Sequence, residues 1–167
     1  FYSNQHEELK DVLSDECLLK NINSAFPKLE YLRLGACIDI TSEMTRSFSS
    51  CELPRFPELK TLSIQEPCTV ECGFTNLFRT FATRRLEYLN VGGGGITNDL
   101  VFHVIESCKM VKFISMPNAN ITDDSLYALK DANLKYLKRF KSAYNMNLSS
   151  KACEALARKY HIEHIVD

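Results

Sequence analysis

The chain has 167 residues, of which 45% are hydrophobic and 25% are charged, with a formal net charge of −1 at pH 7. This is the composition of a globular domain with a buried core, and it excludes a disordered chain. Because the net charge is close to zero, it gives no long-range electrostatic attraction to nucleic acid or membranes. No apolar run reaches the roughly 20 residues that a membrane span needs. We therefore expect one domain over residues 1–167, with no membrane partner.

A recurring segment dominates the sequence. Residues 29–34 (LEYLRL), 59–64 (LKTLSI), 86–91 (LEYLNV) and 111–116 (VKFISM) share the template L-x-x-L-x-L with conservative replacements. Residues 134–137 (LKYL) and 162–165 (IEHI) are two weaker copies. Copies begin on average about 27 residues apart, within the roughly 20–29 residues of leucine-rich repeats. We predict a short strand at each copy.

A helical pattern follows several of these strands. Thr41, Thr97 and Thr122 each come after an isoleucine, and each stands where a helix is expected to begin. A threonine is a good residue to cap a helix, and the acidic residues that follow Thr97 and Thr122 suit the positive end of the helix dipole. Residues 14–22 are predicted to form the helix of an earlier repeat. A strand and a helix repeated about six times predict an α/β leucine-rich-repeat solenoid, a curved parallel sheet with helices on the convex side.

The seven cysteines do not fit a disulfide framework, because their number is odd. Four of them, at positions 17, 51, 108 and 153, fall within predicted helices. We expect them to be free, buried thiols, which is typical of a reducing compartment. The predicted location is intracellular, either cytoplasmic or nuclear.

The first strong copy also resembles a known family, the cysteine-containing leucine-rich repeats. The residues that match the template of that family are Leu29, Leu32, Leu34, Cys37, Ile40 and Thr41. Later copies keep the Ile-Thr pair but have Gly94 and Ala119 in place of the loop cysteine. The resemblance covers nearly the whole chain and is specific for the repeat class.

This resemblance implies a function. Many members of the class are F-box proteins, in which the repeats hold the substrate of a cullin-type ubiquitin ligase. On this basis we expect substrate recognition, with an F-box ahead of residue 1 in a longer protein that would bind the ligase adaptor. The alternative is a structural or assembly subunit that packs permanently against other chains.

The predicted strands suggest where a protein partner would bind. Because strand side chains alternate, the third and fifth positions of each copy point to the concave face. The third positions are Tyr31, Thr61, Tyr88, Phe113, Tyr136 and His164, and the fifth are Arg33, Ser63, Asn90, Ser115, Lys138 and Val166. We expect Tyr31, Tyr88, Phe113 and Tyr136 to be apolar anchors and Arg33, Lys138 and Arg139 to be polar selectors, with Thr61, Asn90 and Ser115 as further contacts. The alternative to this partner-binding role is that the aromatic side chains pack only on each other.

Charge is unevenly distributed along the chain. Residues 1–53 carry a net charge of −4, whereas residues 109–151 carry +5, most densely at 134–141. This basic segment either docks an acidic partner or is simply a solvated surface. Nucleic acid is the least favoured partner, since its binding domains usually have a more basic balance.

Other motifs were weighed against simpler interpretations. The tetraglycine at 92–95 lacks the lysine of a phosphate-binding loop and is interpreted as a tight turn. Cys68 and Cys72 form one pair of possible metal ligands, and His161 and His164 form another. The two pairs lie several repeats apart, so they should not meet around a metal ion. No hydrolase, metalloprotease or kinase signature is present in the sequence. We expect no catalytic activity, no cofactor and no metal site.

Overall fold

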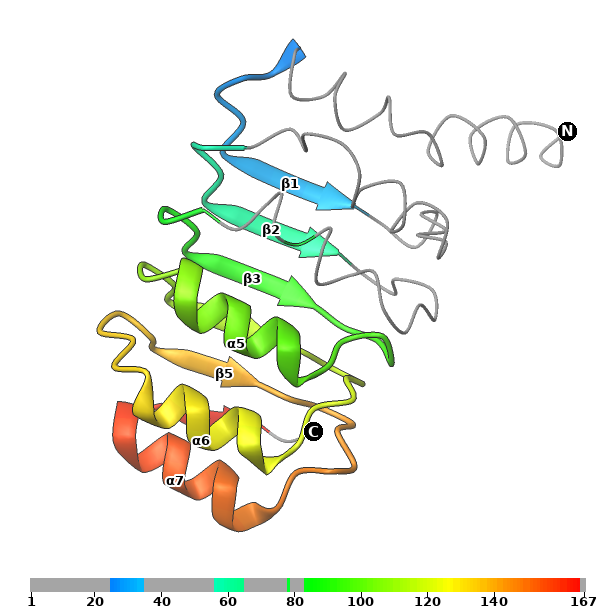
Figure 1. Ribbon diagram of the computed structural model, residues 1–167, viewed down its shortest axis with the longest axis vertical. Coiled ribbons are helices and arrows are strands. Elements are labelled where there is room, and N and C mark those ends of the chain that lie inside the picture. Colours follow the sequence, from blue (N-terminus) through cyan, green and yellow to red (C-terminus); the bar gives the residue numbers. More distant parts are fainter. Residues whose placement is uncertain (1–24, 35–55, 65–77, 79–82, 166–167) are drawn as a thin grey trace, which may run out of the picture.

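The computed structural model describes residues 25–34, 56–64, 78 and 83–165, which form a parallel sheet with helices on one side. In chain order the elements are β1 (Tyr31–Leu34), β2 (Thr61–Ile64), β3 (Tyr88–Val91), α5 (Asn98–Ser107), β4 (Phe113–Ser115), α6 (Asp123–Asp131), β5 (Arg139–Lys141), α7 (Ser150–Tyr160) and β6 (Glu163–Ile165). The strands lie side by side in the order in which they occur along the chain (Figure 1). The fold is α/β, as predicted; the helices expected at 14–22 and after Thr41 lie outside the described residues.

The same tight turn precedes each of the first five strands. In each turn a backbone N–H donates to the carbonyl three residues earlier: Leu29 to Phe26, Leu59 to Phe56, Leu86 to Thr83, Val111 to Cys108 and Leu137 to Leu134, at 3.0–3.3 Å. The leucine or valine after the turn is the first position of the L-x-x-L template. The turn therefore sets where each strand begins and which of its side chains point to the core.

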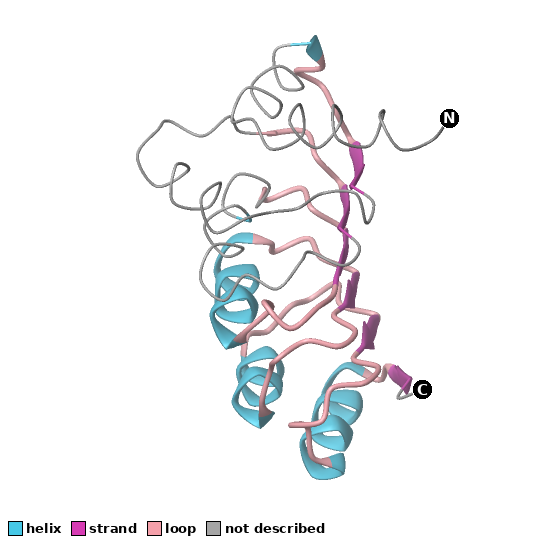
Figure 2. Ribbon diagram, turned by 90° about the vertical axis from the view of Figure 1, so that its right-hand side faces the viewer, coloured by secondary structure: helices cyan, strands magenta, loops and turns pink. Residues whose placement is uncertain are grey.

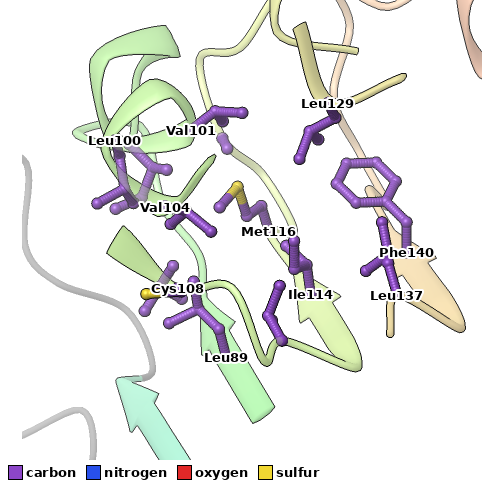
Figure 3. Close-up of a cluster of buried hydrophobic side chains, with 14 of the residues drawn as sticks. Leu89, Leu100, Val101, Val104, Cys108, Ile114, Met116, Leu129, Leu137 and Phe140 are labelled. Carbon is purple, nitrogen blue, oxygen red and sulfur yellow. The ribbon is translucent and has the colours of Figure 1, made fainter. Parts of the chain in front are cut away.

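The core lies between the sheet and the helices, which pack on the same face (Figure 2). The fourth position of the template in β2 to β5, which is Leu62, Leu89, Ile114 and Phe140, is fully buried. The helices contribute Leu100, Val101, Val104, Leu126, Leu129, Ala152 and Leu156. Figure 3 shows several of these side chains pointing toward one another between β3, β4, β5 and the helices. Burial of such apolar surface is the main source of stability.

Two of the predicted free thiols belong to this core. Cys108 and Cys153 are buried and free, as predicted, whereas Cys17 and Cys51 lie outside the described residues. Burial raises the pKa of the Cys108 thiol to about 12, against a small opposing effect of Lys109. The thiol therefore stays protonated at neutral pH and packs as a small apolar group.

The helices α5 and α6 begin at the predicted threonines, but the threonine side chains do not make the expected capping hydrogen bonds. Thr97 and Thr122 are the N-cap residues of α5 and α6, yet neither side chain caps its own helix. Instead, the Asn98 side chain accepts from the Thr122 backbone N–H and donates to its hydroxyl, both at 2.9 Å. Asp123 likewise accepts from the backbone N–H (2.7 Å) and hydroxyl (2.6 Å) of Ser149. The first residue of one helix thus holds the start of the next.

The glycine segment is a turn, as predicted, and the structure shows why glycine is needed there. A Cβ atom on Gly92 would lie 2.6 Å from the Pro117 carbonyl oxygen, which belongs to the loop after the neighbouring strand. Gly93 has a φ of 122° and donates its N–H to the same carbonyl at 3.0 Å. Close backbone approach and a positive φ are the two situations that only glycine meets without strain.

The predicted register of the last two strands was wrong. Phe113 pairs with Arg139, not with Tyr136, so the fifth copy of the template begins at Leu137 rather than at Leu134. Leu134 is the buried residue that opens the preceding turn, and its spacing of three from Leu137 imitates the template. Glu163, and not His164, pairs with Arg139, which is a shift of one residue. A one-residue shift exchanges the two faces of a strand.

Candidate partner-binding surface

Within the part of the chain that the structure describes, the helices cover one face of the sheet and leave the other bare (Figure 2). We refer to the bare side as the open face. One in-register row of side chains on it, the outer row, consists of Tyr31, Thr61, Tyr88, Phe113 and Arg139. Tyr31 is 58% exposed and Tyr88 is 36% exposed, although their neighbours in sequence, Leu32 and Leu89, are buried. The alternation expected of a sheet with one solvated face is therefore present at these positions of β1 and β3, whereas Ser63 of β2 and Ser115 of β4 are buried.

The centre of the outer row is an aromatic pair. The rings of Tyr88 and Phe113 are stacked, with centroids 4.3 Å apart and planes inclined by only 4°. Each ring comes from a different strand, β3 or β4, and the strand spacing of about 4.8 Å brings them into contact. Because their positions are already fixed by stacking, these side chains lose little conformational entropy when a partner covers them.

A second row, the polar row, runs beside the first. It consists of Arg33, Ser63, Asn90, Ser115 and Lys141, again paired in register. Asn90 Nδ2 donates to the Ser63 hydroxyl at 3.4 Å, and Ser63 and Ser115 are buried. The middle of this row is small and uncharged, while a basic residue stands at each end. A partner segment lying across the strands would meet the partly exposed amide of Asn90 in the centre and a basic residue at both ends.

Ion pairs bridge neighbouring strands just before they begin. Lys60 Nζ lies 2.7 Å from Glu30 Oε1, and Lys112 Nζ lies 2.6 Å from Glu87 Oε2. These partly exposed pairs contribute little stability, but they neutralise charge along β1–β4. Lys138 takes the same position before β5 that Lys112 takes before β4. Among the described side chains no carboxylate pairs with Lys138. The charge of the surface therefore changes from balanced to basic at β5.

The structure places seven of the ten predicted contact residues on the two rows where they were expected. These are Tyr31, Arg33, Thr61, Tyr88, Asn90, Phe113 and Ser115. Tyr136 is instead in the turn before β5, with Lys135 Nζ 5.4 Å from its ring centroid, and Lys138 also precedes the strand. Both were placed on strand positions because of the register error. Arg139, predicted from its charge, takes the third position of its strand, and Lys141 takes the fifth position that had been assigned to Lys138.

The described residues contain no group of three or more His, Cys, Asp or Glu side chains able to hold a metal ion; Cys68 and Cys72 lie outside them. No helix among them combines the length and apolar character of a membrane span. A cleft of about 320 Å³ lies between the loop after β5 and α7, and Cys153 lines it. Burial and, to a lesser extent, the charge of Asp123 raise the pKa of that thiol, so it is not a reactive thiolate at neutral pH.

No protein-family model matches the chain, and no curated protein matches it.

Proposed function

We propose that the chain is a single leucine-rich-repeat solenoid of about six units that binds a protein partner on its open face, the concave face of such a solenoid. The repeat spacing, the chain-order parallel sheet and the identical turn before five strands support the architecture. Enzymatic activity forms no part of the proposal. The protein works by recognition, in an intracellular compartment.

One observation carries the binding function. Tyr31 and Tyr88 are exposed on the side of the sheet that no described helix covers, and Tyr88 stacks with Phe113 in the middle of that side. Aromatic side chains that are exposed, rigid and flanked by polar groups are typical of the energetically important centre of a protein interface. The polar row beside them adds the partly exposed amide of Asn90 and a basic residue at each end, which suits the polar margin of such a centre.

The cellular context follows from the resemblance to cysteine-containing leucine-rich repeats. In that context the open face would hold the substrate of a cullin-type ubiquitin ligase, and a separate region of the protein would bind the ligase adaptor. The binding face and the ligase context are independent parts of the proposal, so a test has to separate them.

Affinity capture of the full-length protein from cells, followed by mass spectrometry, makes this separation. We compare the wild type with Tyr88→Ala/Phe113→Ala on the open face and with Phe102→Ala/Met110→Ala, which truncates two exposed apolar side chains outside the outer and polar rows. A cullin and its adaptor should be captured by all three, and a substrate should be lost only from the open-face variant. If nothing is lost from that variant, open-face recognition is wrong. If a fixed stoichiometric complex without a cullin is captured, the ligase context is wrong and the protein is an assembly subunit.

A further inference from the structure

The loops that follow β3, β4 and β5 share a backbone feature. Gly93, Asn118 and Tyr144 each lie three residues beyond the same in-register position of the polar row, and each has a positive φ, of 122°, 52° and 60° respectively. The loops after β3 and β5 leave the sheet at the same edge (Figure 1). Glycine adopts a positive φ without cost and asparagine tolerates it well, but a bulky aromatic residue in this conformation is strained.

The strain at Tyr144 is imposed by its neighbours. The Ala143 carbonyl accepts the N–H of Asn118 at 2.8 Å. On the other side, Asn145 Nδ2 donates to the Met116 carbonyl at 2.8 Å, and Asn145 Oδ1 accepts from the Ala119 N–H. Residues on both sides of Tyr144 are thus attached to the preceding loop. A strained backbone persists when the surrounding structure fixes it in this way.

Packing does not explain why a tyrosine stands there. The Tyr144 side chain is 69% exposed, and Met146, two residues later, is 93% exposed. Glycine or asparagine, which serve at the equivalent positions, would satisfy the backbone and expose no apolar surface. Residues with a strained backbone cluster at active sites and ligand-binding segments, and exposed apolar side chains that lie together mark interaction surfaces.

The charge beside this loop indicates what it binds. Arg139 and Lys141 lie on β5, which leads directly into the loop, and Lys138 precedes them. Among the described side chains no carboxylate is paired with any of the three; Glu163, on the adjacent strand, is the register partner of Arg139. Residues 109–151 carry an excess of five positive charges. Positive charge next to exposed apolar groups is complementary to an acidic segment that also bears an apolar side chain.

We propose that Arg139, Lys141, Tyr144 and Met146, here called the β5 rim, bind an acidic, carboxylate-rich segment of the partner protein. Carboxylates of that segment meet Arg139 and Lys141, and an apolar side chain meets Tyr144 and Met146. This inference rests on the proposed function, since the rim continues the open face, and it adds the chemistry of the partner.

The probes are three fluorescent 12-residue peptides, in which leucine alternates with glutamate, with lysine or with serine. Their binding to the full chain is followed by fluorescence anisotropy. We expect the glutamate peptide to bind more tightly than the other two, and Lys141→Glu to abolish this preference. Lys151→Glu, which makes the same charge change on α7, is the control and should leave the preference in place.

The decisive variant is Tyr144→Gly. Removal of the side chain should weaken binding of the glutamate peptide by about tenfold, while the thermal unfolding midpoint stays the same or rises because the strain is gone. Asn118→Gly, the equivalent change one strand earlier, should not affect binding. A lower midpoint for Tyr144→Gly would show that the side chain is structural and would overturn the inference.

Two further outcomes separate this inference from the proposed function. If none of the three peptides is preferred, or if Tyr144→Gly binds like the wild type, the β5 rim inference is wrong. Loss of the natural substrate from Tyr88→Ala/Phe113→Ala in the capture experiment would then still support open-face recognition. If Tyr88→Ala/Phe113→Ala retains that substrate, the proposed function is contradicted, whatever the result of the peptide-binding measurement.

Discussion

The two faces of the sheet are made by the same short strands, yet they carry different side chains. On the helix side, successive strands place Leu62, Leu89, Ile114 and Phe140 in one row, and every member is apolar and fully buried. On the open face the adjacent row is Thr61, Tyr88, Phe113 and Arg139, which combines a hydroxyl, two aromatic rings and a cation. Close packing restricts the first row to apolar groups that fill the core. The open face has no such restriction, so its chemistry is available for recognition.

The largest effect on stability should come from the buried row. Leu89→Ala removes a fully buried side chain from the centre of the core and should lower the free energy of unfolding by about 3 kcal/mol, within the usual 2–5 kcal/mol for such truncations. Tyr88→Ala, one residue away on the open face, should cost about 1 kcal/mol through loss of the stacked pair. Chemical denaturation of both variants measures the contrast. Equal losses would show that the two faces do not differ as described.

The contact between neighbouring loops gives a second, smaller contrast. Gly92→Ala places a methyl group against the Pro117 carbonyl and should destabilise the protein by about 1–3 kcal/mol, the usual cost of overpacking. Gly94→Ala is the matched control, because a Cβ atom there meets nothing within 4 Å. Its effect should stay within about 0.5 kcal/mol. If thermal unfolding finds the two variants equally stable, the loops are not packed as closely as the structure shows.

The smallest expected effect is a pH dependence at the start of α7. Hydrogen bonds from the Ser149 hydroxyl and backbone N–H lower the pKa of the Asp123 carboxyl from its ordinary value of 3.8. Because the pKa is lower in the folded state, the stabilisation is complete above the ordinary value and is lost as the pH falls through the folded one. Asp123→Asn should therefore be less stable than the wild type at pH 6, and the difference in unfolding temperature should shrink below about pH 4.

Asp124→Asn is the control for this measurement, because it removes the neighbouring carboxylate in the same helical turn without touching Ser149. A difference between Asp123→Asn and the wild type that stays constant from pH 6 to pH 3 would show that the hydrogen bonds do not select the ionised carboxylate.

The sequence was sufficient for the strands whose template is complete. Residues 29–34, 59–64, 86–91 and 111–116 contain β1 to β4, and the fourth position of each copy is buried as predicted. The fifth-position residues Ser63 and Ser115, which were expected on the concave face, are buried as well. The fifth strand was misplaced because the turn before a strand can also put an apolar residue three positions ahead of the template, as Phe56 precedes Leu59. Leu134 and Leu137 repeat that spacing, and the turn was mistaken for the strand. Comparison with Phe56-Pro-Glu-Leu59 could have corrected the register from the sequence.

The part of the surface that sequence reasoning missed lies beyond β5. Lys141 would have taken its place in the polar row once the register was right. Tyr144 needed a further step, since a backbone φ is not visible in a sequence. Its equivalence to Gly93 and Asn118, two residues typical of a positive φ, becomes apparent only when the three loops are aligned on the corrected strands.

We propose that the aromatic pair on the open face binds the partner. The most direct test is the dissociation constant of the captured partner for the wild type, for Tyr88→Ala/Phe113→Ala and for Phe102→Ala/Met110→Ala. We expect the open-face variant to lose more than about 2 kcal/mol of binding free energy, roughly a thirtyfold weaker affinity, while it remains folded and the control binds normally. If the folded open-face variant binds with unchanged affinity, the aromatic pair is not the binding site.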